Sequence, residues 1–187
     1  MDIIMFGTIG SGRTTAAQYM KQKGNFELRQ IAAFMHMVIK SLNYQELDYT
    51  TVQQEFAAQA RHIFGPHVWN EHLSYLIQQN QQMHHGYGGF PPNFIIWDGK
   101  TKDDLIFWKD RGFLDVGVIT DVDLCCERLV KSGHLDPSKY LQHSSEKEVR
   151  KIASQCKFKI YNNGDLADLQ QQVDTLFSEI YSYNSDD

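Results

Sequence analysis

The sequence is poor in cysteine and proline and contains no long hydrophobic run. Two of its three cysteines, Cys125 and Cys126, are adjacent and the third, Cys156, is distant. This spacing does not suit a metal site and indicates reduced thiols without a chemical role. No apolar run approaches the roughly 20 residues that cross a bilayer, so a membrane partner is not expected. Because no basic, apolar leader opens the chain, we expect a cytoplasmic protein.

An excess of positive charge is also missing, since the formal net charge is −5. A protein that binds the backbone of a nucleic-acid polymer needs a dominant positive surface, so such a partner is not expected. Local basic clusters still suit a small phosphorylated molecule. With 187 residues, 42% of them hydrophobic, the chain predicts one folded domain over 1–187. The sequence does not indicate an oligomeric state.

Short apolar runs typical of buried strands occur at 3–6, 94–97, 116–119 and 158–161. Each is followed by turn residues and a stretch with helical periodicity, an alternation that predicts an α/β fold around a parallel sheet. A long helical region separates the first two runs, and Gly65 and Pro66 end one of its helices. The polar, then Gly- and Pro-rich stretch 78–93 predicts a surface connection.

The first run leads into GTIGSGRT, residues 7–14, which has the spacing of a phosphate-binding loop. Its glycines let the backbone wrap an anion with its N–H groups, and the helix that begins near Arg13 adds its positive end. The Thr14 hydroxyl takes the position that ligates the Mg²⁺ of a nucleotide. A purely structural turn is the alternative. The candidate nucleotide-binding residues are Gly7, Gly10, Ser11, Gly12, Arg13, Thr14 and Thr15.

Arg13 departs from this motif, which has lysine at the same position. Lysine carries a compact charge that follows the transferred phosphoryl group, whereas the guanidinium is larger, planar and always charged. We therefore expect nucleotide binding to tolerate the exchange better than catalysis does. Arginine still neutralises charge at the β- and γ-phosphates, so Arg13 remains a candidate catalytic residue.

Asp98 ends the second apolar run, within FIIWDGK. Folds with a phosphate-binding loop hold a carboxylate at such a strand end, where it positions Mg²⁺ directly or through water. The alternative is an ordinary turn or helix cap. Because Thr14 and Asp98 occur together, the sequence favours a magnesium site and a working enzyme.

Beyond the loop, the chain contains in order IAAFMHMVIK, QQEFAAQARHIFGPHVWNEHL, FIIWDGKTKDDLIFWKDRG, QHSSEKE and FKIYNNGDLADL. This order resembles P-loop nucleoside monophosphate kinases, especially the phage-type deoxynucleoside monophosphate kinases, and similar segments occur in phosphomevalonate and dephospho-coenzyme A kinases. The resemblance implies a three-layer α/β fold with a five-stranded parallel sheet and ATP and Mg²⁺ as cofactors. It also implies a helical acceptor-binding region at about 30–92 and a lid at about 128–146.

The same resemblance implies contacts to a phosphorylated acceptor. In such kinases the phosphate of the acceptor is held by a helix-ending lysine and by an arginine in an AR-x-x-FG segment, which correspond to Lys40 and Arg61. By periodicity alone, Arg61 would be an exposed residue beside the apolar stripe of its helix. Trp69 would line the acceptor pocket, with burial in the core as the alternative. Lys100 stands where the family pattern Asp-x-Arg has arginine.

Two further segments resemble the lid and the base-binding loop of these kinases. In ERLVKSGHLDPSKYLQHSSE, Arg128 and Lys131 would close over the phosphates and exclude water. For Lys131, a solvated helix end is an equal alternative. YNNGDLADL resembles the loop that packs against adenine, which makes Asn162, Asn163 and Gly164 candidate neighbours of the base and Asn163 a candidate donor contact. An ordinary turn followed by a helix cap at Asp165 is the alternative.

These features predict a kinase that transfers the γ-phosphoryl group of ATP to a phosphorylated small molecule, with a deoxynucleoside monophosphate as the preferred acceptor. Arg13, Asp98 and Arg128 are the candidate catalytic residues. Dephospho-coenzyme A and phosphomevalonate are alternative acceptors. The alternative from another class is a regulatory protein in which Arg13 binds a nucleotide without supporting turnover.

Overall fold

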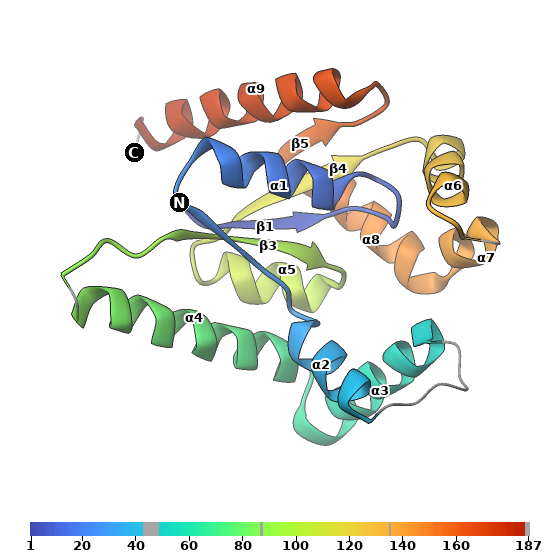
Figure 1. Ribbon diagram of the computed structural model, residues 1–187, viewed down its shortest axis with the longest axis horizontal. Coiled ribbons are helices and arrows are strands. Elements are labelled where there is room, and N and C mark those ends of the chain that lie inside the picture. The colour runs from blue at the N-terminus through green and yellow to red at the C-terminus, as the bar shows by residue number, and fades with distance from the viewer. Residues whose placement is uncertain (43–48, 87, 135, 186–187) are drawn as a thin grey trace. The chain divides into compact units, whose positions relative to one another are not determined.

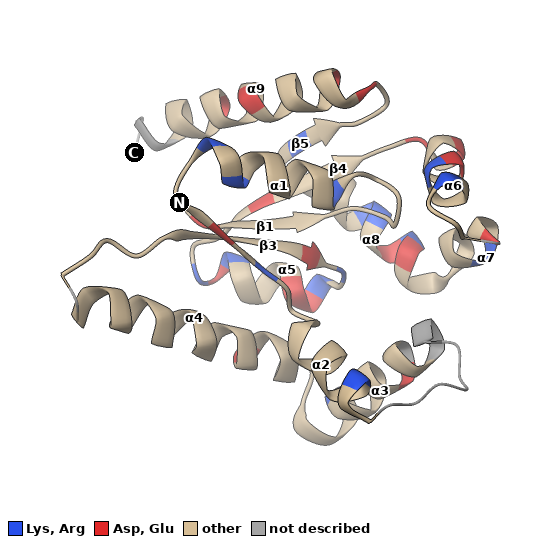
Figure 2. Cartoon of the chain, in the orientation of Figure 1, with Lys and Arg blue, Asp and Glu red and all other residues tan. Residues whose placement is uncertain are grey.

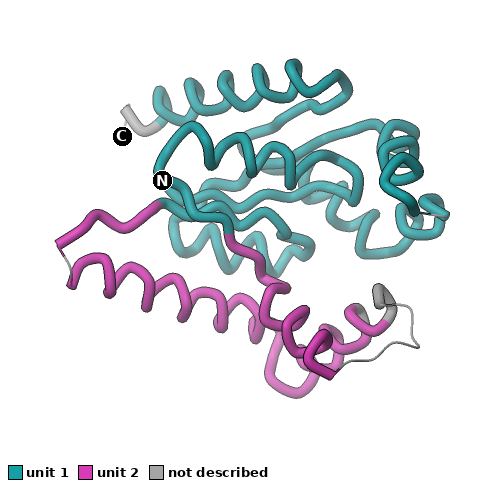
Figure 3. The backbone as a smooth tube through the Cα atoms, in the orientation of Figure 1, with its two compact units in different colours: residues 1–28, 93–187 teal, residues 29–92 magenta. Residues whose placement is uncertain are grey.

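The computed structural model describes residues 1–42, 49–86, 88–134 and 136–185. The chain forms two compact units, one made of Met1–Leu28 with Asn93–Asp187 and the other of Arg29–Pro92 (Figure 3). Within the predicted acceptor region, positions 43–48 and 87 lie outside the described residues, as does position 135 of the predicted lid.

Five parallel strands form one sheet, in the order β2-β3-β1-β4-β5 (Figure 1). The central strands are near-continuous apolar runs, as expected for strands that are covered on both faces. This confirms the predicted α/β fold with a five-stranded parallel sheet. The strands are β1 (Ile3–Phe6), β2 (Phe26–Arg29), β3 (Asn93–Gly99), β4 (Leu114–Ile119) and β5 (Phe158–Tyr161).

Helices cover both faces of this sheet (Figure 1). On one face lie α1 (Arg13–Lys23) and α9 (Leu166–Ser185), and on the other α5 (Lys102–Lys109) and α8 (Ser144–Gln155). Alternate residues of each strand point to opposite faces, so the sheet contributes to two apolar layers. The layer beneath α1 and α9 includes Ile3, Met5, Ala16, Met20, Ile95, Val116, Val118, Ile160, Leu169, Val173, Leu176 and Ile180.

Two shorter helices connect β4 to α8. They are α6 (Val122–Lys131) and α7 (Pro137–Gln142), which meet around a small apolar cluster that contains Cys125. All three cysteines are free thiols, and both Cys125 and Cys156 are buried. Burial raises the pKa of the Cys125 thiol and raises that of Cys156 to about 12, so these two thiols stay protonated at neutral pH.

The second unit consists of α2 (Ala33–Ser41), α3 (Tyr49–Phe64) and α4 (Val68–Gly86). α2 packs on α3, and α3 packs on α4, whose Trp69 and Leu73 are buried. α4 continues to Gly86, so the prediction of a surface connection from position 78 was wrong over its first half. Glutamine is a good helix former, and the Gln-rich stretch extends the helix before the glycines end it.

Charged residues of both signs are interspersed along α5, α6 and α8 (Figure 2). Some are paired, as in the 3.1 Å contact between Lys109 Nζ and Asp115 Oδ1. In the described parts of the chain, no helix combines the length and the apolar character needed to cross a membrane.

Gly117 of β4 supports a prediction about stability. A Cβ atom at this position would lie 2.0 Å from the carbonyl oxygen of Ala153 in α8. Gly117→Ala should therefore force strand and helix apart and lower the free energy of unfolding by about 1–3 kcal/mol, measured by urea denaturation. At Gly86 an added Cβ would meet no atom within 4 Å, so Gly86→Ala should change stability by less than about 0.5 kcal/mol. Equal stabilities of the two variants would contradict this packing.

Candidate phosphate-binding site

The loop that connects β1 to α1 lies at the carboxyl end of β1, as predicted. Gly10 and Gly12 adopt φ angles of +80° and +90°, in the left-handed region that favours glycine. α1 begins at Arg13, and no described side chain caps it. The first N–H groups of this helix therefore lack intrahelical partners and, with the positive end of the helix dipole, provide an anion-binding site.

Two buried side chains from neighbouring strand ends hold this loop in place. The carbonyl oxygen of Ser11 accepts hydrogen bonds from Thr120 Oγ1 at 3.0 Å and from Asn162 Nδ2 at 2.8 Å. A Cβ atom on Gly12 would lie 2.2 Å from Asn162 Nδ2, so only glycine fits there. This role of Thr120 and Asn162 in holding the loop was not predicted from the sequence. The available signal was a polar residue directly after each of two buried strands.

Arg13, which replaces the motif lysine, is half-buried and points toward the end of β3. Its Nη1 donates a hydrogen bond to the carbonyl oxygen of Gly99 at 3.0 Å. Burial lowers the pKa of the guanidinium from its ordinary value, and the nearby carboxylates of Glu146 and Asp98 oppose this shift. The structure thus brings two predicted site residues, Arg13 and Asp98, close together and adds a third charged group.

An irregularity in β3 positions Asp98. Ile4 of β1 pairs with Ile96, but Phe6 pairs with Gly99, so β3 contains one extra residue between these pairs. Such bulges change the direction of side chains and are frequent beside functional sites. Asp98 is half-buried and is the last residue but one of β3, the strand adjacent to β1, so it lies at a strand end as predicted from the sequence.

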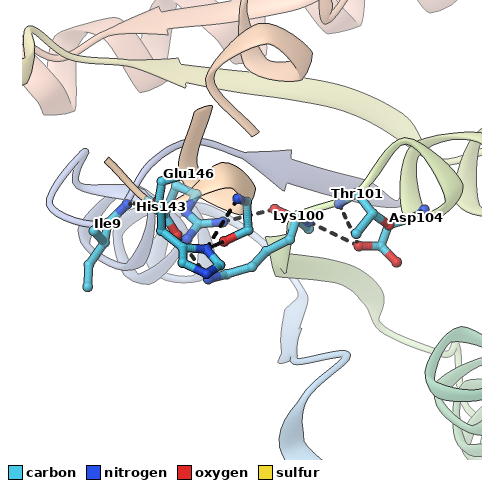
Figure 4. Close-up of polar contacts among 9 residues, drawn as sticks. Ile9, Lys100, Thr101, Asp104, His143 and Glu146 are labelled. Atoms are coloured by element: carbon cyan, nitrogen blue, oxygen red, sulfur yellow. Dashed lines mark hydrogen bonds and ion pairs between the residues drawn. The ribbon is translucent and has the colours of Figure 1, made fainter. Parts of the chain in front are cut away.

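Lys100 and Glu146 form an ion pair at the mouth of the loop (Figure 4). Lys100 Nζ lies 3.1 Å from Glu146 Oε1, and the N–H group of Ile9 donates to Glu146 Oε2 at 2.8 Å. The backbone of Lys100 is fixed by its N–H bond to Asp104 Oδ2 in the first turn of α5. The contacts of Glu146 with Ile9 and Lys100 were not predicted, because both partners are far from Glu146 in the sequence.

A pocket of about 280 Å³ lies beside the loop. Arg128 forms part of its wall and donates from Nη2 to the carbonyl oxygen of Gly164 at 3.1 Å. The pocket is lined by Gly12, Thr15, Arg128, Asn162, Gly164, Asp165, Leu166 and Leu169.

Of the other predicted residues in these segments, Asp165 lines the pocket, whereas Asn163 and Lys131 do not. Asn163 is exposed and accepts a hydrogen bond from the N–H of Asp121 at 2.9 Å. Asp165 caps α9, since its Oδ1 accepts from the N–H of Asp168 at 3.0 Å, in line with the helix-cap alternative. Lys131 is the exposed last residue of α6.

The candidate acceptor residues of the second unit occupy helix ends and its interior. Lys40 is exposed in the last turn of α2, and Arg61 is half-buried in the last turn of α3. Trp69 is buried, and its Nε1 donates to the carbonyl oxygen of Ala57 at 3.4 Å. Its ring lies 5.9 Å from that of Phe56, so Trp69 packs inside this unit, in line with the core alternative.

The side chains around the loop suit a magnesium nucleotide. Mg²⁺ is typically held by one or two protein oxygens together with phosphate oxygens of the substrate. Thr14 presents an exposed hydroxyl in the first turn of α1, and Asp98 presents a carboxylate at the adjacent strand end. Among the residues that the structure describes, no three His, Cys, Asp or Glu residues come together as a metal site.

Comparison with known proteins identifies the fold. No family model matches the sequence, and no curated protein matches it. Shikimate kinase from Aquifex aeolicus matches with a TM-score of 0.57 and 18% identity over 97% of this chain and 98% of that one. Shikimate kinase from Bacteroides thetaiotaomicron matches with a TM-score of 0.55 and 14% identity, covering 97% and 98%. A sugar kinase from Janibacter sp. matches with a TM-score of 0.54 and 13% identity over 95% of this chain and 94% of that one. The chain therefore has the three-layer α/β fold of P-loop kinases.

Asn162 and Asn163 provide a matched pair for testing how the loop is held. Asn162→Ala removes a buried hydrogen bond to Ser11, and we expect it to lower the free energy of unfolding by about 1–3 kcal/mol. Asn163→Ala removes an exposed contact and should cost less than about 0.5 kcal/mol. Thermal and urea unfolding of both variants measure the difference. A larger loss for Asn163→Ala would show that Asn162 does not anchor the loop.

Proposed function

We propose that this protein transfers the γ-phosphoryl group of ATP to a phosphorylated small molecule, with a nucleoside or deoxynucleoside monophosphate as the preferred acceptor. One observation carries the proposal. The start of α1 carries a cation, Arg13, that feels the charge of a strand-end acid, Asp98, and Gly12 and Thr15 at this helix start line a pocket. This combination fits a nucleotide whose phosphates lie along the loop.

The donor would occupy two adjoining parts of the first unit. Its nucleoside would enter the pocket of about 280 Å³, where Leu166 and Leu169 offer apolar surface and Arg128 a charged edge. Its phosphates would then follow the loop from Gly12 toward Arg13. Asn162 contacts both the loop and Arg128, so the base pocket and the phosphate site share one anchoring residue.

Thr14 and Asp98 would hold Mg²⁺, which neutralises charge on the donor phosphates when bound. In the transfer, an oxygen of the acceptor phosphate forms a bond to the γ-phosphorus while the bond from that phosphorus to the β–γ bridging oxygen breaks, and ADP leaves. No side-chain nucleophile is required. Arg13 would stabilise the charge on the transferred group, and the buried setting of its guanidinium strengthens such interactions.

The acceptor assignment rests on the second unit and on the resemblance to nucleoside monophosphate kinases. Lys40 and Arg61 place cations at the ends of α2 and α3, which pack on each other. Cations at helix ends suit an acceptor that carries a phosphate. Trp69 is less suited to contact the acceptor, because it packs inside the unit.

A second candidate function is a nucleotide-binding regulatory protein. The observation that favours it is the replacement of the motif lysine by Arg13, whose guanidinium already donates to Gly99. An arginine fixed in this way binds phosphate without following the transferred group.

Acceptor-dependent ATP consumption distinguishes these functions. A coupled assay would compare nucleoside and deoxynucleoside monophosphates, dephospho-coenzyme A and phosphomevalonate, with shikimate as an acceptor that lacks a phosphate. Turnover with a phosphorylated acceptor supports the proposed kinase. Tight ATP binding without turnover of any acceptor would favour the regulatory function.

Arg13 is the sharpest test within the loop. Arg13→Ala should lower kcat about a hundredfold or more, because one preorganised charge contact to the transferred group is lost. Arg13→Lys should retain substantial activity, since lysine is the residue that this loop geometry normally holds. Lys21→Ala removes an exposed cation from the same helix and should leave kcat unchanged. If Arg13→Lys instead created activity in an inactive protein, the regulatory function would be correct.

Arg61 tests the acceptor site. Arg61→Ala should raise the KM for the phosphorylated acceptor about tenfold or more through loss of one charge-assisted contact, with ATP affinity unchanged. His62→Ala, at the exposed neighbouring position, serves as control. Steady-state kinetics with each substrate varied, and calorimetric titration with ATP, provide the measurements. Equal losses for ATP and acceptor would indicate a structural role for Arg61.

A further inference from the structure

Glu146 places a carboxylate against the phosphate-binding loop (Figure 4). One carboxylate oxygen of Glu146 accepts a hydrogen bond from the N–H group of Ile9, which lies within the phosphate-binding loop. The other oxygen pairs with Lys100. Arg13 lies near enough for the charge of Glu146 to oppose the lowering of the Arg13 pKa by burial. A backbone N–H group and the Lys100 cation therefore contact this carboxylate, and a second cation, Arg13, lies nearby. A phosphate oxygen would take partners of the same kind.

We propose that Glu146 is an internal substitute for a donor phosphate, which occupies the loop in the nucleotide-free protein and must leave when the donor binds. This inference rests on the proposed use of the loop for the phosphates of ATP. What it adds is competition: the carboxylate of Glu146 and the donor phosphate compete for the same loop, so donor binding must displace the side chain. We call Glu146 in this role the gate.

Burial and charge explain why both anions cannot remain. Glu146 is 5% exposed, so its carboxylate is held away from water and depends on its protein partners for stabilisation. A terminal phosphate carries more charge than a carboxylate and would take the same N–H group and cations. Two anions that share the same partners lie close together, and they repel each other strongly where water is scarce. Arrival of the phosphate therefore expels the side chain.

The chain around Glu146 has a joint that suits such a displacement. α7 ends at Gln142 and α8 begins at Ser144, so a single residue separates them. That residue, His143, has extended backbone angles of φ −57° and ψ 144°, and its Nδ1 accepts the N–H of Ser145 at 3.3 Å. Glu146 follows in the first turn of α8. Withdrawal of Glu146 would therefore act directly on the joint between α8 and the α6–α7 segment.

The consequence is a coupling between the phosphate site and the predicted lid. While Glu146 stays in the loop, it holds the start of α8 close to Ile9 and Lys100. Once phosphate replaces it, these contacts are lost and the segment before α8 gains freedom to move. Donor binding would thus be weakened by the gate, and the rearrangement would begin only when phosphate is present.

Removing the charge of Glu146 tests the gate without any acceptor. Glu146→Gln keeps the size of the side chain and an oxygen for the Ile9 N–H, but it abolishes the competing anion. We expect calorimetric titration to show tripolyphosphate and MgATP binding tightened about fivefold or more. Adenosine affinity should stay unchanged, because adenosine carries no phosphate. Glu148→Gln, an exposed residue of the same helix, is the matched control and should alter none of these affinities.

Unchanged or weaker tripolyphosphate binding by Glu146→Gln would overturn the gate and assign Glu146 a positioning role for Lys100 and Arg13. Should that variant fail to fold, NMR of the wild-type protein decides. Tripolyphosphate must then shift the side-chain carboxyl carbon of Glu146 together with the Ile9 amide, and a constant Glu146 signal at saturation would refute displacement. Because neither measurement uses an acceptor, a lack of kinase turnover would refute the proposed function alone.

Discussion

The geometry of the candidate site depends on one backbone atom, the carbonyl oxygen of Ser11. Buried donors from the ends of two strands, Thr120 and Asn162, converge on it and hold the loop at the carboxyl end of the central strands. This leaves the N–H groups at the start of α1 directed outward for an anion. A loop with glycines at positive φ has many accessible conformations, and two hydrogen bonds from rigid strand ends select one of them.

Electrostatics at the loop are more balanced than the motif alone suggests. A phosphate-binding loop usually offers a surplus of positive charge, but here Arg13 has two carboxylates near it and Lys100 is paired with one of these acids. The site is therefore nearly neutral before a ligand arrives. Its affinity for phosphate must come from rearranging charges that are already satisfied, which links binding strength to the cost of separating them.

The sequence predicts local features well and distant contacts poorly. The strand at 94–97 was evident as an apolar run, because burial on both faces requires one. The strand at 158–161 was evident because its alternate residues Phe158 and Ile160 are apolar and buried. β2, with the sequence FELR, was not, since only Phe26 is buried and its charged residues conceal the strand. The position of Asp98 at a strand end was predictable, because this acid ends an apolar run. Glu146 was not, because its bond to Ile9 spans 137 positions and only the folded chain brings the two together.

The second unit is inserted into the first between β2 and β3, two strands that lie next to each other in the sheet. The N–H of Asn93, at the start of β3, donates to the carbonyl oxygen of Asn25 just before β2, at 2.9 Å. The second unit thus connects the carboxyl end of β2 to the start of its neighbour β3. Insertions at such sites leave the host fold intact, so Arg29–Pro92 is organised as an exchangeable module. Evolution or protein engineering can replace this module, and with it the proposed acceptor preference. The strand order of the sheet and the phosphate-binding loop would be preserved.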